Sequence, residues 1–137
     1  MGTVRRQARI ARSADDVWEI IGDPTTISRW FPGIVDATVD GNTRVVTTES
    51  GIPMPEEIVT NDAIQRRFQY RITAGIVHNH LATIDVFDLG DGSSLVAYAT
   101  DCDPDAMALM IGGATGNALL ELKRQLEAPS ASRPNAR

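Results

Sequence analysis

Two histidines, two tyrosines and a glutamate are the residues of this 137-residue chain whose types and spacing could carry out chemistry. His78 and His80 are the only histidines, and they are two residues apart in a predicted strand. Side chains at positions i and i+2 of a strand point to the same face. That face also carries Ala82, Ile84 and Val86, so we expect the pair to point inward. There the imidazoles could move protons in an enolisation or dehydration, or they could line a wet cavity mouth without a catalytic role.

Tyr70 and Tyr98 each lie on an apolar strand face, where a tyrosine commonly buries its ring and keeps its hydroxyl available. Those hydroxyls could donate hydrogen bonds to a bound carbonyl. Glu57 is expected to point inward and to act as a general base with a raised pKa, or else to pair with Arg44 or Arg71. The candidate catalytic residues are therefore His78, His80, Tyr70 and Glu57.

The sequence contains no motif typical of a metal site or of a cofactor site. A zinc site built on the two histidines would need a third ligand from Glu57 or Asp103, and no spacing typical of zinc sites is present. No glycine-rich phosphate loop is present either. Cys102 is the single cysteine, so an internal disulfide is excluded and we expect a buried, structural thiol. We predict neither a metal nor a cofactor.

Composition and charge exclude several classes of protein. The net charge of −5 argues against a nucleic-acid binder, which needs a basic face. The arginines near the N-terminus are interpreted as a solvated strand edge. No segment approaches the ~18 consecutive apolar residues that span a bilayer, and residues 1–12 lack the apolar stretch of a secretory signal. We predict a cytoplasmic protein without stable membrane insertion, for which a homodimer remains open.

The elements that must position these residues follow from periodicity and turn signals. Residues 4–10 are predicted to be a strand, followed by two short helices that begin at Ser13 and at Asp23-Pro24. Six strands follow between residues 34 and 102, with an interruption at 51–55. A long amphipathic helix runs from about Pro104 to Glu127. Its predicted buried stripe is Met107, Met110, Ile111, Ala114, Ala118, Leu122 and Leu126.

The long helix also contains Gly112, Gly113 and Gly116, each of which costs up to ~1 kcal/mol relative to alanine. Glycines at this density predict a bend, a close approach to the sheet or to a partner, or a break between two helical segments.

Several short motifs resemble one known superfamily. They are Ser13-Ala-Asp-Asp-Val-Trp18, Asp23-Pro24 through Trp30-Phe31-Pro32, Glu57 with Val59, Tyr70-Arg71-Ile72, and Asp91-Gly92-Ser93 before Val96 and Tyr98. Up to about residue 127 the chain resembles the polyketide cyclase/dehydrase-like branch of the START/Bet v 1 (SRPBCC) superfamily. The resemblance implies an α+β helix-grip fold, in which a curved antiparallel sheet of about seven strands wraps on the long C-terminal helix. Residues 1–128 would form this single domain, and residues 129–137 a disordered tail.

The resemblance also implies a cavity between the sheet and the long helix, and three functions remain open. The first is binding of a small hydrophobic molecule of lipid, polyketide or aromatic type. The second is a cofactor-independent polyketide cyclase or dehydratase, which needs the candidate catalytic residues to converge. The third is a protein-interaction module with an exposed apolar patch and a filled interior. The predicted ligand-binding residues are Phe68, Tyr70, His78, His80, Ile84, Tyr98, Met107 and Met110.

Overall fold

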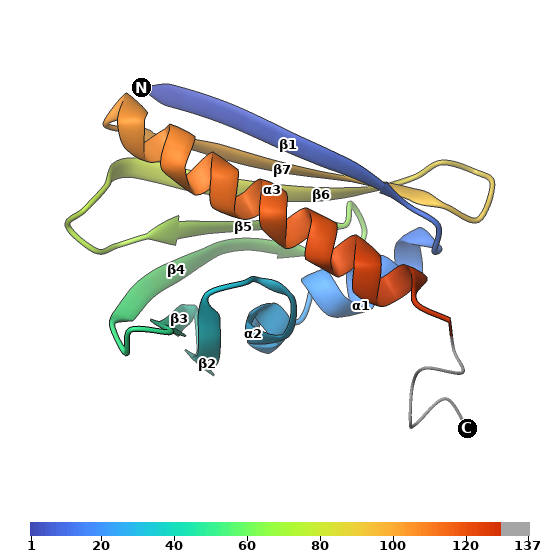
Figure 1. Ribbon diagram of the computed structural model, residues 1–137, viewed down its shortest axis with the longest axis horizontal. Helices are drawn as coiled ribbons and strands as arrows, with labels where there is room; N and C mark the ends of the chain where they lie inside the picture. Colours follow the sequence, from blue (N-terminus) through green and yellow to red (C-terminus); the bar gives the residue numbers. More distant parts are fainter. Residues whose placement is uncertain (130–137) are drawn as a thin grey trace.

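The computed structural model, which describes residues 1–129, contains one seven-stranded antiparallel sheet and a long C-terminal helix. The strand order is β1-β7-β6-β5-β4-β3-β2, so that β1 and β2 form the two edges (Figure 1). The strands are β1 (Gly2–Ile10), β2 (Ile34–Asp40), β3 (Thr43–Thr48), β4 (Pro53–Asp62), β5 (Arg67–Ile72), β6 (His78–Asp88) and β7 (Ser94–Asp103). The helices are α1 (Ala14–Ile21), the short 3-10 helix η1 (Pro24–Thr26), α2 (Ile27–Trp30) and α3 (Asp105–Glu127). Of the predicted disordered tail, residues 130–137 lie outside the described residues.

Two side-chain caps place the short helices between the edge strands, as the sequence predicted. The Ser13 hydroxyl accepts a hydrogen bond from the Asp16 N–H at 3.1 Å, which starts α1. The Asp23 carboxylate accepts from the Thr25 N–H at 3.0 Å, and Pro24 follows it at the first position of η1. The chain therefore leaves β1 at one edge of the sheet, passes through the short helices and begins β2 at the other edge (Figure 1).

The main core lies between the sheet, α1 and the C-terminal half of α3. Fully buried side chains from strands and helices meet there, among them Ile10, Val17, Phe68, Ile84, Tyr98, Leu119 and Leu122. A smaller cluster of Val77, Cys102 and Ala108 fills the space under the start of α3. The arrangement is the predicted α+β helix-grip fold, with one curved sheet against one long helix (Figure 1).

The buried face of α3 differs from the predicted stripe. Ala118 and Leu122 are buried as expected, whereas Ala114 is exposed and Met110 is 68% exposed. The residues that face the sheet are small ones: Ala108, Gly112, Thr115 and Ala118, with Leu119 and Leu122 further along. Small side chains let the helix backbone lie close to β1. The face of α3 that is buried is therefore the one with the smallest side chains, and not the one with the most hydrophobic side chains.

Gly112 explains the close approach, because a Cβ built there would lie 2.5 Å from Val4 Cγ1. The helix runs without a break, and a Cβ at Gly113 would meet nothing within 4 Å. We therefore expect Gly112→Ala to lower the free energy of unfolding by about 1–3 kcal/mol through overpacking. Gly113→Ala should raise it by up to about 1 kcal/mol, because alanine is the better helix former. Urea unfolding of wild type and both variants measures these changes in the free energy of unfolding. Changes of the same sign in the two variants would contradict the packing argument.

The predicted interruption at residues 51–55 is wrong in part, because β4 begins at Pro53. Met54 and Pro55 pair with Val46 and Val45 of β3, although β5 begins to pair with β4 only at Glu56. On the side of β4 away from β3, the Pro55 carbonyl accepts a hydrogen bond from the Thr73 N–H at 3.1 Å. The prolines are tolerated here because the pairing of β4 with β5 only begins at this end of the strand. The early start of β4 is what places Met54 beside the candidate site.

Candidate functional site

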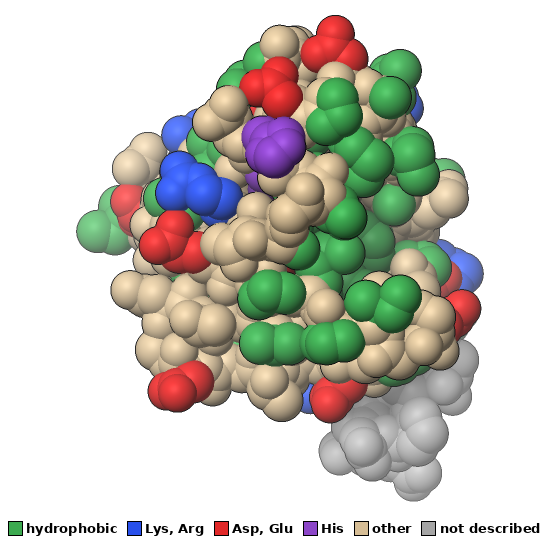
Figure 2. Space-filling model, turned by 90° about the vertical axis from the view of Figure 1, so that its left-hand side faces the viewer, with side chains coloured by type: hydrophobic (Ala, Val, Ile, Leu, Met, Phe, Trp, Pro, Cys, Tyr) green, Lys and Arg blue, Asp and Glu red, His purple; other side chains and the backbone are tan. Residues whose placement is uncertain are grey.

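A pocket of about 300 Å³ opens between α3 and strands β2 to β5, at the end of the molecule where α3 begins. Figure 2 looks at this end, and hydrophobic side chains gather in the middle of the face, with charged side chains around them. Most of the lining is apolar. The lining residues are Phe31, Pro32, Gly33, Ile34, Val46, Thr48, Met54, Glu56, Tyr70, Ile72, Ile111 and Ala114.

Local sequence explains why space remains here. Pro32 and Gly33 end α2, and Gly33 adopts a φ of +90°, which glycine adopts without steric cost. The resulting turn forms one rim of the pocket. On the opposite side α3 contributes the small Ala114, while its first half is held against β1 through Gly112. The helix therefore leaves a gap above β3, β4 and β5.

The floor of the pocket carries a buried ion pair that the sequence analysis missed. Glu56 on β4 is only 4% exposed, and its Oε1 accepts a hydrogen bond from Arg44 Nε at 2.7 Å. Arg44 on β3 is also buried, and its Nη1 donates to the Pro24 carbonyl at 3.1 Å. Burial raises the pKa of Glu56, and the Arg44 charge and hydrogen bond oppose that rise. The guanidinium held at 2.7 Å favours the ionised carboxylate.

Aromatic rings enclose the arginine. The Arg44 guanidinium lies 4.8 Å from the Tyr70 ring centroid and 5.4 Å from that of Phe68. These are cation–π distances, and the arginine is buried against both rings. The hydroxyl of Tyr70 is hydrogen-bonded to that of Tyr98, and burial raises the pKa of both phenols well above the ordinary value. Both hydroxyls are therefore neutral groups that can donate as well as accept.

The two histidines do not share a face, contrary to the prediction. The register of β6 against β7 shifts between His78 and Leu81, and Asn79 adopts a φ of +50°. This irregularity turns His78 into solvent while His80 stays buried. His80 Nδ1 accepts a hydrogen bond from the Ile72 N–H at 2.9 Å. Burial and the nearby Arg71 charge lower the pKa of His80 to about 4, so its ring is neutral at physiological pH.

Glu57 likewise points outward and not into the cavity. Its side chain is 54% exposed and pairs with Arg71 at 3.0 Å, which was the alternative considered from the sequence. Strand parity gives the reason: Met54, Glu56 and Ile58 share the inner face of β4, so Glu57 must lie on the outer face. The alternation of Met54, Glu56 and Ile58 in the sequence could therefore have predicted that Glu56 points inward. Likewise, Arg44 is two residues from the buried Val46, so both side chains lie on the inner face of β3.

The structure distributes the eight predicted ligand-binding residues over several environments. Tyr70 lines the pocket. Phe68, Ile84 and Tyr98 are buried in the main core beneath it, and His80 is buried behind the end of β5. Met107 packs against the small core cluster under the start of α3, whereas His78 and Met110 are exposed to solvent. Of the four catalytic candidates, only Tyr70 and His80 come close, with ring centroids 5.9 Å apart.

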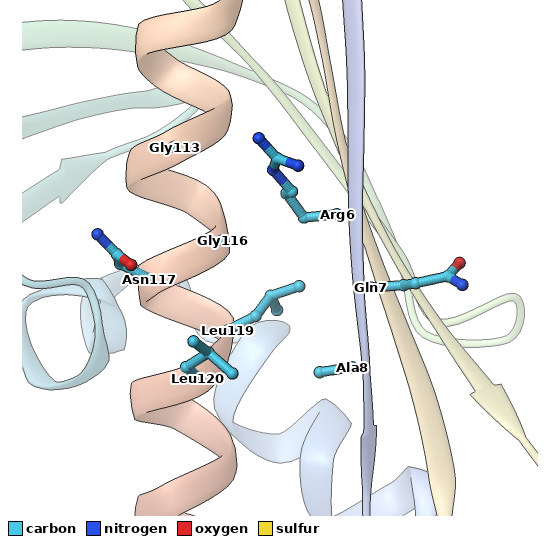
Figure 3. A pocket seen from close by; sticks show the side chains of 8 residues that line it. All are labelled: Arg6, Gln7, Ala8, Gly113, Gly116, Asn117, Leu119 and Leu120. Carbon is cyan, nitrogen blue, oxygen red and sulfur yellow. The ribbon is translucent and has the colours of Figure 1, made fainter.

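A second hollow of about 400 Å³ lies on the edge of the sheet, between β1 and α3. Figure 3 shows Arg6 reaching toward the helix, where its Nε donates to the Gly112 carbonyl at 3.1 Å, while Gln7 points away. Gly113, Gly116 and Leu120 form the helix side. Within residues 1–129 no buried charged side chain lines this open groove, whereas the buried Glu56 lines the first pocket. Its features are those of a surface groove, so the floor of the first pocket is the better candidate site.

Within residues 1–129 no group of three or more His, Cys, Asp or Glu side chains is arranged to hold a metal ion. In the same range, no helix combines the length and the apolar character that crossing a membrane requires. Cys102 is fully buried, and burial raises the pKa of its thiol. The predicted structural role of this cysteine agrees with that environment.

The geometry defines what the pocket can do chemically. Apolar walls can bury a hydrophobic molecule, and two polar side chains on the floor can contact a polar group of that molecule. Glu56 has one carboxylate oxygen engaged with Arg44 and the other, Oε2, without a hydrogen bond within residues 1–129. Tyr70 adds a neutral phenol that lines the same space. The pocket therefore combines one acceptor, one donor–acceptor group and mostly apolar walls.

Comparison with known proteins gives one sequence family and many similar folds. The family model described as polyketide cyclase/dehydrase and lipid transport matches residues 1–127. Among curated proteins, no match to this sequence is found. The protein XoxI from Bacillus cereus has a similar structure, with a TM-score of 0.86 and 24% identity over 92% of this chain and 96% of that one.

Two further solved structures extend the likeness. A START superfamily protein from Mycobacterium smegmatis gives a TM-score of 0.76 at 15% identity, covering 93% of this chain and 98% of the other. Norcoclaurine synthase from Thalictrum flavum, in complex with dopamine and hydroxybenzaldehyde, gives a TM-score of 0.70 at 17% identity, covering 90% of this chain and 84% of the other. At these identities the solved structures establish a shared fold.

Proposed function

The chain belongs to the polyketide cyclase/dehydrase and lipid transport family, and from this premise we propose that it binds a small hydrophobic molecule in the pocket between α3 and β2 to β5. The observation that carries the proposal is the composition of the lining, which is apolar except for Thr48 at the rim and Glu56 and Tyr70 at the floor. Such a lining is typical of small-molecule sites, in which a few polar groups fix the orientation of an apolar ligand.

The volume supports a small ligand. About 300 Å³ lies at the lower end of the range for small-molecule sites, ~300–1,000 Å³. An aromatic or polyketide-derived molecule of one or two rings, or a single short acyl chain, fits this space better than a two-chain lipid does. A cytoplasmic location, the absence of a nucleic-acid partner and a homodimer remain predictions from the sequence alone.

Binding of the neutral fluorescent probe N-phenylnaphthylamine tests the site. Wild type should enhance the fluorescence of the probe, and Ala114→Trp should weaken binding by about tenfold or more, because the indole would fill the pocket next to Ile111. Met110→Trp is the matched control on the same helix, and its exposed side chain does not line the pocket. Circular dichroism verifies that both variants fold.

Two results would count against the proposal. If wild type binds no probe, a binding function fails and a protein-interaction module becomes the leading hypothesis, with the exposed Leu109 and Leu120 on α3 as its apolar surface. If Ala114→Trp and Met110→Trp both bind as wild type does, the ligand occupies another place, and the groove between β1 and α3 is the next site to block.

One observation favours catalysis as a second candidate. Glu56 is buried in the pocket, its pKa is raised by burial, and Oε2 is uncommitted, which suits a general base that takes a proton next to a carbonyl. In deuterated water, wild type should accelerate deuterium incorporation into the α-carbon of an aryl ketone, here tetralone, and Glu56→Gln should abolish the acceleration. Exchange at the uncatalysed rate, despite measurable tetralone binding, would leave a binding function alone.

A further inference from the structure

The hydrogen-bonding capacity of the pocket floor is specific enough to define a ligand class. Glu56 and Tyr70 lie on adjacent strands, with Glu56 opposite Ile72 and Ile58 opposite Tyr70, so the two side chains are diagonal neighbours on one face. Thr48, the other lining residue with a polar side chain, is already engaged, because its hydroxyl bonds the Ile52 carbonyl and the Ser50 hydroxyl at the rim. The ligand's polar group must therefore be satisfied by Glu56 and Tyr70.

Glu56 offers only an acceptor. Oε1 is held by Arg44 at 2.7 Å, and Oε2 accepts no hydrogen bond within residues 1–129. An ionised carboxylate cannot donate, so the ligand must bring a proton to Oε2. An ether or an ester oxygen placed there would face a lone pair, and the desolvated carboxylate oxygen would remain without a partner.

Charge excludes ionic ligands. Glu56 and Arg44 neutralise each other, and both are nearly inaccessible to water. A ligand carboxylate would meet Glu56 as a like charge, whereas a ligand ammonium would compete with Arg44, which is already aligned and covered by the rings of Phe68 and Tyr70. Burying a third, unbalanced charge in this site is costly. A neutral donor is the remaining choice.

A hydroxyl satisfies both floor groups at once. Either hydroxyl of the Tyr70–Tyr98 pair can be the donor, and Tyr70 is the one of the two residues that lines the pocket. When Tyr98 donates to Tyr70, the hydrogen of the Tyr70 hydroxyl is free for a ligand. A ligand hydroxyl can donate to Glu56 Oε2 and accept from Tyr70. An ether can only accept, and a thiol is a weak donor.

We propose that the pocket selects neutral apolar alcohols and phenols, whose hydroxyl donates to Glu56 Oε2 and accepts from Tyr70, over the corresponding ethers and carboxylates. The inference rests on the proposed binding function and names the ligand class for the same site.

Three naphthalene derivatives with one substituent at the same ring position test the proposal on the wild-type protein by isothermal titration calorimetry at neutral pH. Naphthol should bind about tenfold or more tightly than methoxynaphthalene, because only the phenol supplies the proton that Glu56 accepts. Naphthoate should bind more weakly than both, because its charge faces that of Glu56.

Variants of two adjacent glutamates extend the test. In Glu56→Gln the amide oxygen can accept from Arg44, which turns the NH₂ group toward the pocket, so the preference should invert in favour of methoxynaphthalene. Glu57→Gln changes the exposed neighbour and should leave the preference as in wild type. If Glu56→Gln does not fold, the wild-type series decides.

The outcomes separate the two proposals. If none of the three compounds binds, the proposed binding function fails. If naphthol and methoxynaphthalene bind with equal affinity and Ala114→Trp excludes both, the binding function stands and the selection of hydroxyl compounds is overturned.

Discussion

Replacing Glu56 with alanine is expected to lower the free energy of unfolding by about 3–5 kcal/mol, a large part of the stability of a domain this size. The substitution removes the partner of Arg44 and leaves the guanidinium charge nearly inaccessible to water. The Pro24 carbonyl and the two aromatic rings that remain around Arg44 do not compensate a full charge. Urea unfolding at neutral pH, compared with wild type, measures the loss.

Glu57 is the matched control, because it is the next residue along the same strand and also pairs with an arginine. Its pair with Arg71 is exposed, so Glu57→Ala should cost about 1 kcal/mol or less. The double variant Arg44→Met/Glu56→Leu removes both buried charges and should recover most of the stability lost in Glu56→Ala. Equal losses for Glu56→Ala and Glu57→Ala would show that the buried pair does not dominate the stability of the pocket floor.

The fold was largely predictable from local signals. Caps at Ser13 and Asp23 and alternation along the strands are short-range features that survive in the final structure. What local signals did not determine was the rotation of α3 about its axis. That rotation depends on Gly112 meeting Val4 on a strand more than 100 residues earlier in the chain, a contact that hydrophobic periodicity does not contain.

The site was harder to predict because its residues depend on strand parity. A single irregularity, at Asn79, moves His78 to the outer surface while His80 stays inside. For Glu56 and Glu57 no irregularity intervenes, and the alternation with Met54 and Ile58 shows which of the two glutamates points inward. That alternation was overlooked because β4 was expected to begin only at Glu56, which left Met54 outside the strand. Predicting the Arg44–Glu56 pair also requires the register of β3 against β4, in which the two residues are directly opposite.

Acidification should weaken the native state through His80. In the folded protein the pKa of His80 is lowered to about 4, from an ordinary value of 6.5, by burial and by the Arg71 charge, while Asp101 opposes the shift. The hydrogen bond from the Ile72 N–H to Nδ1 gives a structural reason, because a proton on Nδ1 would displace that donor. Nε2 is buried without a partner within residues 1–129, so charging the ring gains no new hydrogen bond there.

The sign of the effect follows from proton uptake. Above pH 6.5 the ring is neutral in both the folded and the unfolded state, so His80 gives no pH dependence. Between pH 6.5 and about 4 the unfolded chain binds a proton that the folded protein does not, and the free energy of unfolding falls by about 1.4 kcal/mol per pH unit. Below pH 4 both states are protonated and the loss levels off, at about 3 kcal/mol in total.

Urea unfolding at several pH values between 7 and 4, carried out on wild type, His80→Gln and His78→Gln, isolates this contribution from that of the carboxylates. The stability difference between wild type and His80→Gln should change by about 3 kcal/mol across that range, whereas His78→Gln should follow wild type, because His78 is exposed in the folded protein. Titration of the imidazole protons by NMR reads the His80 pKa directly. An NMR midpoint near 6.5 for His80, or parallel pH curves for wild type and His80→Gln, would mean that the ring is accessible to water, contrary to its burial behind Ile72 and Tyr70.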